Sequence, residues 1–194
     1  KLSSLAQGEA CIPVPISAQL DLFKAPILPE VAEEISEATA RLVEGSRTSY
    51  DLVIADTGQF WSGLTGELLC NSDLVLLVMD QRRSSVYGAI KALELCQRLG
   101  IPGARIAFVL NRASGLSRGE IERIEDSLGC EELFRLADGK ASVEALVGTG
   151  RIEELVEEGA SPTSDVESLL AALLPRVGIE FSASERKRAR RFFP

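Results

Sequence analysis

The stretches YDLVIADTG (residues 50–58), SDLVLLVMD (72–80) and ARIAFVLNR (104–112) decide the fold of this chain. Each is a short apolar run that ends in polar residues, and patterns typical of helices separate the three. Because the apolar residues do not alternate with polar ones, the runs favour strands that are buried on both faces, as in a parallel sheet. We therefore expect an α/β fold, a three-layer sandwich with a mainly parallel sheet.

Working outward from these runs, we expect neighbouring parallel strands at Leu52–Ala55, Leu74–Met79 and Ile106–Leu110. Apolar spacing of three to four residues predicts the helices around them. The helices are expected at Trp61–Cys70, Ser84–Leu99, Ile121–Leu128 and Asp165–Leu174, with short pieces at Val143–Val147 and Ile152–Val156; a strand at Leu20–Leu28, a helix from Pro29 to Gly45 and a strand at Leu133–Leu136 complete the set, and Lys1–Gln19 is expected as a connecting segment. Ser117 and Glu120 have the spacing of a capping box.

Length and composition limit the classes of protein. The 194 residues, 45% of them hydrophobic, are enough for one domain over residues 1–181, followed by a short tail over 182–194. The net charge of -8 argues against a surface that grips nucleic acid, which needs clustered cations. There is no histidine, which excludes a Ser-His triad and any His-ligated metal.

The four cysteines also bear on the cellular compartment of the protein. Cys11, Cys70, Cys96 and Cys130 lie far apart with no CxxC pair, and we expect buried free thiols in a reducing cytoplasm. No apolar run reaches the length of a membrane span, and no signal peptide is visible. The sequence therefore predicts a cytoplasmic location.

Two strand ends carry candidate binding residues. Asp56 follows the first buried run, where a carboxylate can hold magnesium or its waters; it can equally cap the strand end or the next helix. Asn111, with Arg112, ends the third run, and its amide offers a donor and an acceptor side by side, which suits the edge of an adenine ring. A turn residue that closes the strand is an equally good interpretation of Asn111.

Taken in order, the three runs, the helix start SSVYGAI (84–90) and the stretch LFRLADGKASVEALVGTG (133–150) resemble the C-terminal half of the MinD/ParA family of deviant-Walker ATPases. Within that family the sequence is most similar to the CpaE/TadZ branch, which is associated with Flp-type (Tad) pilus assembly, and FKAPILPEVAEEI (23–35) resembles that branch too. The similarity extends over about Leu20 to Leu174. It implies a P-loop NTPase-like topology.

The resemblance also implies a function and site residues. Members of the family form magnesium-dependent ATP sandwich dimers that localise other proteins. By position, Asp56 matches the switch II aspartate near magnesium, which it would bind through water. Asn111 with Arg112 matches the adenine-recognition segment, and Asp138 matches the loop that covers the base. No catalytic residue is assigned, and ATP with Mg²⁺ is the implied cofactor pair.

Two departures from the family pattern bear on activity. Asp56 is followed by TGQFW where the family has Asp-x-Pro-x-Gly, which puts the placement of the hydrolytic water in doubt. A phosphate-binding loop at GxxxxGK[ST] spacing does not occur anywhere in the chain. In this fold the loop lies on the central strand, so we expect it upstream of Lys1 rather than lost in evolution. ATPase activity therefore depends on whether the full-length protein carries the loop.

The expected function is that of an ATP-binding positioning protein, a homodimer that works with pilus-assembly or other localisation proteins. The alternative is a non-catalytic scaffold with the same fold. A receiver domain phosphorylated at Asp56 is a third interpretation, and it lacks the acidic pair and the lysine that it requires. The tail Glu185–Pro194 carries five basic residues and one acidic residue, so it is either a solvated end or a peripheral contact with an anionic membrane, at a pole or elsewhere.

Overall fold

The computed structural model describes residues 13–23, 43–58, 61–151, 154, 156 and 161–181. It divides the chain into an N-terminal unit, Lys1–Ser72, and a C-terminal unit, Asp73–Pro194. The tail predicted over residues 182–194 lies outside the described residues, and so does most of the helix predicted from Pro29 to Gly45, of which residues 43–46 are helical. The single domain over residues 1–181 stays a prediction.

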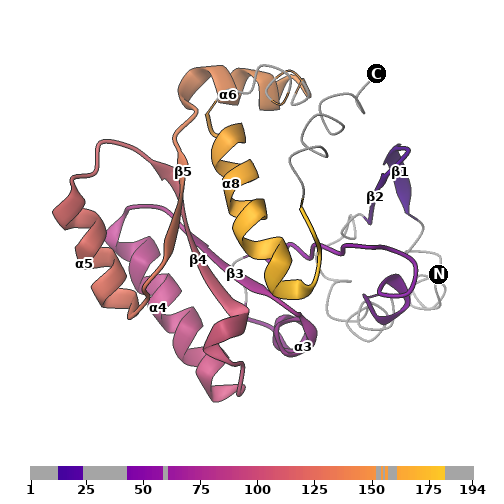
Figure 1. The fold of residues 1–194 in the computed structure, drawn as a ribbon, viewed down its shortest axis with the longest axis horizontal. Helices are drawn as coiled ribbons and strands as arrows, with labels where there is room; N and C mark the ends of the chain where they lie inside the picture. The colour runs from indigo at the N-terminus through magenta and orange to yellow at the C-terminus, as the bar shows by residue number, and fades with distance from the viewer. Residues whose placement is uncertain are drawn as a thin grey trace. The chain divides into compact units, whose positions relative to one another are not determined.

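The C-terminal unit is the predicted α/β sandwich (Figure 1). Three strands form a parallel sheet in the order β3-β4-β5, with Val75 opposite Ile106 and Phe108 opposite Leu133. In chain order the elements are β3 (Val75–Met79), α4 (Arg83–Arg98), η3 (Gly103–Arg105), β4 (Ile106–Ala113), α5 (Arg118–Leu128), β5 (Leu133–Ala137), α6 (Lys140–Gly148), α8 (Thr163–Leu173) and η4 (Leu174–Val177). The predicted strands Leu74–Met79 and Ile106–Leu110 are therefore confirmed as parallel neighbours.

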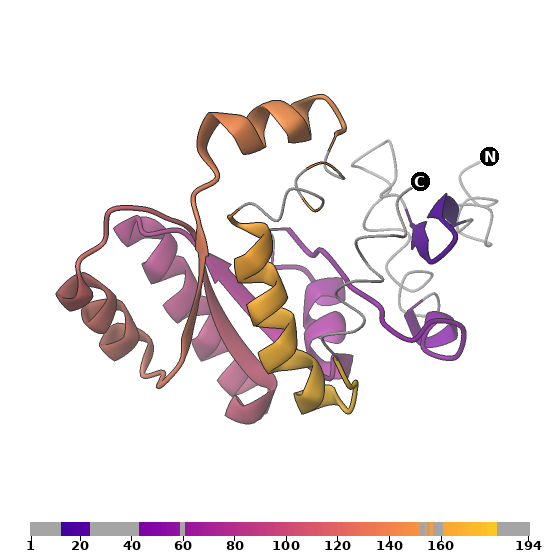
Figure 2. The same ribbon diagram turned by 45° about the horizontal axis from the view of Figure 1, so that its top comes forward.

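Helices cover both faces of this sheet (Figures 1 and 2). On one face, Leu169 and Leu173 of α8 pack on Ala107 and Val109 of β4. On the other face, α4 contacts β3 and packs beside α5. The first five residues of β4 are all buried, because this strand has a neighbour on each side and a helix over each face. The core of the unit is thus centred on β4.

The two outer strands of the sheet, β3 and β5, differ in the contacts that the structure gives them. The outer strand β5 is held by η4, where Arg176 forms an ion pair with Glu132 and its guanidinium carbon lies 5.7 Å from the centre of the Phe134 ring. On β3, Leu76 and Val78 are 43% and 58% exposed, and β4 is the partner that the structure gives this strand. Natural edge strands usually carry charges or bulges that prevent further pairing, and β3 has neither within Val75–Met79.

The predicted capping box at the start of α5 is confirmed. The Glu120 carboxylate accepts hydrogen bonds from the Ser117 hydroxyl at 2.6 Å and from the Ser117 N–H at 2.9 Å. These two bonds, the hydroxyl first, hold the pKa of Glu120 below its ordinary value. At its other end α5 closes at Gly129, whose φ of 63° is the left-handed conformation that glycine adopts without strain.

In the N-terminal unit, β1 (Val14–Ser17) and β2 (Leu20–Leu22) form an antiparallel hairpin, and α3 spans Gly63–Asn71. Beside the hairpin, the Tyr50 hydroxyl donates a hydrogen bond to Asp21 Oδ2 at 2.6 Å. The prediction of a connecting segment up to Gln19 was wrong for β1. A two-stranded hairpin consists of edge strands only, and an edge strand tolerates a proline such as Pro15, so the Pro-rich sequence did not indicate a strand.

The strand predicted at Leu52–Ala55 is also wrong. Residues 52–57 form no regular secondary structure, and the side chain of Ile54 is 83% exposed. An apolar run indicates a preference for burial, whereas a parallel strand exists only where a neighbour offers N–H and C=O groups in register. Among the described residues no strand pairs with this run.

Of the four cysteines, the three that the structure describes are free, as predicted. Cys96 is buried, Cys130 is half-buried, and Cys70 is exposed, which corrects the prediction of buried thiols for Cys70. The cause is its place on an outer position of α3. Burial, followed by the nearby Glu125 charge, raises the pKa of the Cys130 thiol. Within the described ranges, no helix is both long enough and apolar enough to cross a membrane.

Candidate functional site

The C-terminal end of β4 is distorted at Asn111 and Arg112. The register with β5 shifts between Leu110 and Ala113, so a bulge falls on these two residues. Arg112 has a φ of 55°, the left-handed conformation that costs a side-chain-bearing residue energy. Asn111 Oδ1 accepts a hydrogen bond from the Arg112 N–H at 3.0 Å, which stabilises the turn. Bulges of this kind redirect side chains, and they occur frequently beside binding sites.

Asp138 follows β5 directly. Its N–H donates to the Ala113 carbonyl at 3.2 Å, and its Oδ1 accepts from the Lys140 N–H at 3.1 Å. Lys140 also has a positive φ, 53°. Because Ala113 pairs with Ala137, the loop after β5 starts beside the distorted end of β4.

Three of the four predicted site residues therefore meet at one edge of the sheet. Asn111, Arg112 and Asp138 belong to the C-terminal ends of two paired parallel strands, where ligands of open α/β sheets bind. Asp56 belongs to the N-terminal unit, where its Oδ1 accepts from the Gly58 N–H at 3.1 Å and closes a turn. Asp56 therefore caps neither of the elements that the sequence analysis considered, because residues 52–55 form no strand and Ser62 caps α3.

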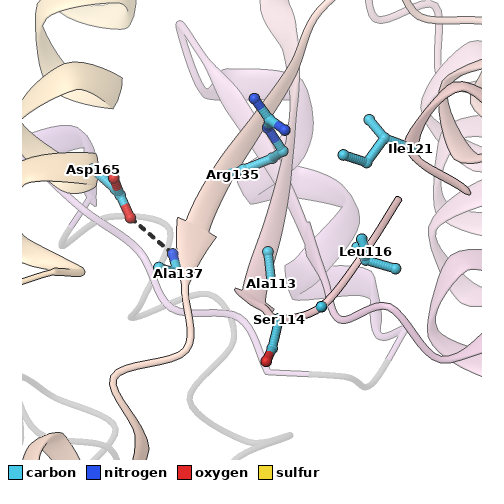
Figure 3. A pocket seen from close by; sticks show the side chains of 8 residues that line it. Ala113, Ser114, Leu116, Ile121, Arg135, Ala137 and Asp165 are labelled. Carbon is cyan, nitrogen blue, oxygen red and sulfur yellow. Dashed lines mark hydrogen bonds between the residues drawn. The ribbon is translucent and has the colours of Figure 1, made fainter. Parts of the chain in front are cut away.

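A pocket of about 300 Å³ lies at the same edge (Figure 3). Its wall comes from the ends of β4 and β5, the loop between β4 and α5, the first turns of α5 and the start of α8. The lining residues are Ala113, Ser114, Gly115, Leu116, Ile121, Arg135, Ala137 and Asp165. The pocket combines small and aliphatic side chains with one cation and one anion. The predicted site residues Asn111, Arg112 and Asp138 lie at the same edge of the sheet but are not among the lining residues.

Two loop contacts at this edge were missed by the sequence analysis. Gln81, after β3, accepts a hydrogen bond at its Oε1 from the Ser114 N–H at 3.1 Å. Asp165, in the first turn of α8, accepts one at its Oδ2 from the Ala137 N–H at 2.8 Å (Figure 3). These pairs are 33 and 28 positions apart in the chain, and no local pattern indicates them.

The residues present can be tested against the implied adenine. Because Asn111 Oδ1 is engaged by the Arg112 N–H, the Asn111 amide group points its two donors elsewhere. Asp138 Oδ1 is engaged by Lys140, which leaves Oδ2 as an acceptor. A donor for a ring nitrogen and an acceptor for an exocyclic amine are the groups that the adenine edge requires, so these residues fit the base.

Fewer residues suit the phosphates and the metal ion than suit the base. The sequence contains no glycine-rich phosphate loop, and the described ranges contain no group of three or more side chains that could hold a metal ion. Asp56 alone offers one carboxylate, with Oδ1 already used in the turn. The described residues therefore include polar side chains suited to a base, and they include no cluster suited to a metal ion.

The C-terminal unit is an α/β sandwich with a parallel sheet, and three of the candidate binding residues lie at the C-terminal ends of its strands. No protein-family model and no curated protein matches the sequence. The structure is similar to the crystal structure of a ParA family ATPase from Chlorobium tepidum TLS, with a TM-score of 0.67 and 23% sequence identity, over 79% of this chain and 67% of that chain. The similarity shows that the two chains share a fold.

Proposed function

We propose that this chain is the base-binding part of an ATP-dependent positioning protein of the MinD/ParA class. The observation that carries the proposal is the pairing of β4 with β5, which brings Asn111 and Asp138 to one edge beside the pocket. The shared fold with a ParA family ATPase supports the class. Arg112 contributes a positive charge at the same edge.

In this proposal the phosphates of ATP bind to a loop on a further strand, which pairs with β3. Support comes from β3, which has the unalternated apolar sequence of a central strand and yet lies at the outside of the described sheet. Leu74 packs against the α8 cluster, while Leu76 and Val78 on the same face are open to solvent. An element packed on that face beside α8 would cover them. Asp56 would then hold Mg²⁺ through water, opposite the phosphate loop.

The finer parts of the proposal rest on the resemblance alone. They are homodimerisation around ATP, the CpaE/TadZ branch, a role in pilus assembly or polar localisation, and peripheral membrane contact through residues 182–194. A non-catalytic scaffold remains the second candidate, favoured by the turn that Asp56 closes with Gly58 and by the missing phosphate loop.

Nucleotide-dependent stability tests the proposal. We expect Mg-ATP to raise the melting temperature of the protein, because a ligand that binds the native state stabilises it by mass action. Asn111→Ala removes a base contact worth about 1 kcal/mol, so the dissociation constant for ATP should rise about fivefold. Gln97→Ala, an amide lost from the exposed side of α4, is the matched control and should bind as the wild type does.

A second comparison concerns magnesium. Asp56→Ala should reduce the magnesium-dependent part of the stabilisation, and Asp51→Ala, a nearby exposed carboxylate, should leave it unchanged. If ATP does not raise the melting temperature even when the phosphate loop is present in the tested protein, the ATPase proposal fails and the scaffold is favoured.

A further inference from the structure

The first turn of α8 touches the loop after β5 on both sides of Asp138. On one side, Asp165 Oδ2 accepts the hydrogen bond from the Ala137 N–H at 2.8 Å (Figure 3). On the other side, Gly139 lies so close to Pro162 that an added Cβ would be 3.2 Å from Pro162 Cδ. The residue assigned to the base is therefore flanked by two residues that α8 and its N-cap hold in place.

The Asp165 carboxylate is suited to this task. It accepts from a backbone N–H, a bond that its charge strengthens, and the Ser161 hydroxyl lies 3.4 Å from the same oxygen. It belongs to the first turn of α8, where the helix dipole favours a negative charge. Its helix is anchored in the core by Leu169 and Leu173, which pack on β4. The carboxylate is thus rigidly placed relative to the sheet.

The Ala137 N–H points to the outer edge of β5, while the next N–H, that of Asp138, points inward to Ala113 of β4. Without Asp165 the outer N–H has no protein acceptor among the described residues. The last residue of β5 could then leave the sheet, and the Asp138 side chain would lose its direction.

We propose that Asp165 is a positioning residue, which holds Ala137 in the sheet and thereby directs Asp138 toward the nucleotide base. The inference rests on the proposed function for the role of Asp138, and its geometric part is independent of any ligand. Asp165 itself does not contact the base in this scheme. It acts on affinity through the backbone of the neighbouring loop.

Three variants separate positioning from general stability. Asp165→Ala removes the acceptor, and Asp165→Asn keeps an acceptor oxygen without the charge. Leu169→Ala weakens the packing of the same helix while keeping the Asp165 carboxylate that accepts from Ala137. Amide hydrogen exchange by NMR reports the protection of Ala137 and Asp138, and calorimetric titration reports the affinity for Mg-ATP.

In Asp165→Ala we expect at least about tenfold lower protection of the Ala137 and Asp138 amides than in Leu169→Ala, and about fivefold weaker ATP binding. Asp165→Asn should restore most of both. Leu169→Ala should lower the unfolding midpoint, and it should weaken ATP binding less than Asp165→Ala does, because Leu173 still anchors the helix.

The inference is overturned if the Asp138 amide is equally protected from hydrogen exchange in Asp165→Ala and in Leu169→Ala, whatever the affinities are. It is also overturned if the Asp138 amide loses protection while ATP binds as tightly as before. If the wild type does not bind ATP when the phosphate loop is present in the tested protein, the proposed function fails, and the exchange comparison alone decides whether Asp165 positions the loop after β5.

Discussion

At the scale of single residues, the backbone departs from regular strand geometry at the C-terminal end of β4 and just after β5, at the positions assigned to ligand binding. Arg112 and Lys140 are the non-glycine residues with positive φ in the described part of the chain, and each follows closely on a predicted site residue. Such conformations cost on the order of 1 kcal/mol or more, and they persist where surrounding contacts enforce them. Here Asn111 and Asp138 provide those contacts by accepting the N–H groups of Arg112 and Lys140.

Alanine substitution should have opposite effects on the stability of the fold at Gly139 and at Gly88. At Gly139 an added Cβ would overlap the Val143 side chain and approach Pro162, so Gly139→Ala should destabilise the fold by about 1–3 kcal/mol through overpacking. At Gly88, inside α4, a Cβ meets nothing within 4 Å, so Gly88→Ala should stabilise the fold by about 0.5–1 kcal/mol. Urea unfolding midpoints measure both. Equal shifts in the same direction would contradict the packing of the loop after β5.

At the scale of elements, the capping box of Ser117 and Glu120 stabilises the start of α5, and Gly129 ends the helix in the left-handed conformation. The capping box lowers the pKa of Glu120, so its ionised form is more stable in the folded protein than in the unfolded chain. The resulting stabilisation is present above the pKa of the unfolded chain, about 4.3, and is lost as the pH falls through the lower folded value.

A pH series tests this element. The difference in the free energy of unfolding between the wild type and Glu120→Ala should be largest near pH 6 and should shrink as the pH falls from about 4.3 toward 3. Chemical denaturation at each pH gives the difference. The control is Glu131→Ala, at an exposed position beyond the end of α5, which should show no such trend. A constant Glu120→Ala effect across the series would mean that the carboxylate charge does not contribute.

The other elements show where local patterns are sufficient. The helix predicted at Ser84–Leu99 is α4, Arg83–Arg98, because its apolar spacing and its glycine end are both local signals. The helix predicted at Asp165–Leu174 is α8, Thr163–Leu173, which ends before Pro175 as expected. A 3-10 turn, Leu174–Val177, follows it, since proline fits the first turn of a new helical segment.

At the scale of the whole molecule, the described residues give the sheet of the C-terminal unit contacts beyond β5 and no strand beyond β3. The ion pair between Arg176 and Glu132 and the bond from Ala137 to Asp165 block further pairing on β5. The open strand β3 presents Leu76 and Val78, the pattern of an edge that lacks a partner.

We therefore expect the nucleotide-free chain to associate as its concentration rises, through β3. Val78→Lys, which places a charge on that strand, should reduce the association in sedimentation velocity experiments. Val147→Lys, at a similarly exposed position on α6, is the control and should associate as the wild type does. If both lysines reduce association to the same extent, the cause is net charge and β3 has no special role.

The sequence by itself determined the α/β class, the pairing partners Leu74–Met79 and Ile106–Leu110, the helices between them and the capping box at Ser117. Each follows from a pattern within a short stretch of sequence: an unalternated apolar run, helical spacing or cap residues. The absence of a phosphate loop was equally plain from the sequence.

Tertiary structure alone decided three other features. They are the bulge that turns Asn111 and Arg112, the acceptance of the Ala137 N–H by Asp165, and the lack of a strand partner for residues 52–55 in the described part of the chain. Each depends on partners far along the chain, 28 positions away in the case of Asp165, and a backbone group cannot indicate through its own residue type which distant group will satisfy it. The sequence thus named candidate residues whose binding role stays a prediction, and only the folded sheet shows that Asn111, Arg112 and Asp138 share one edge.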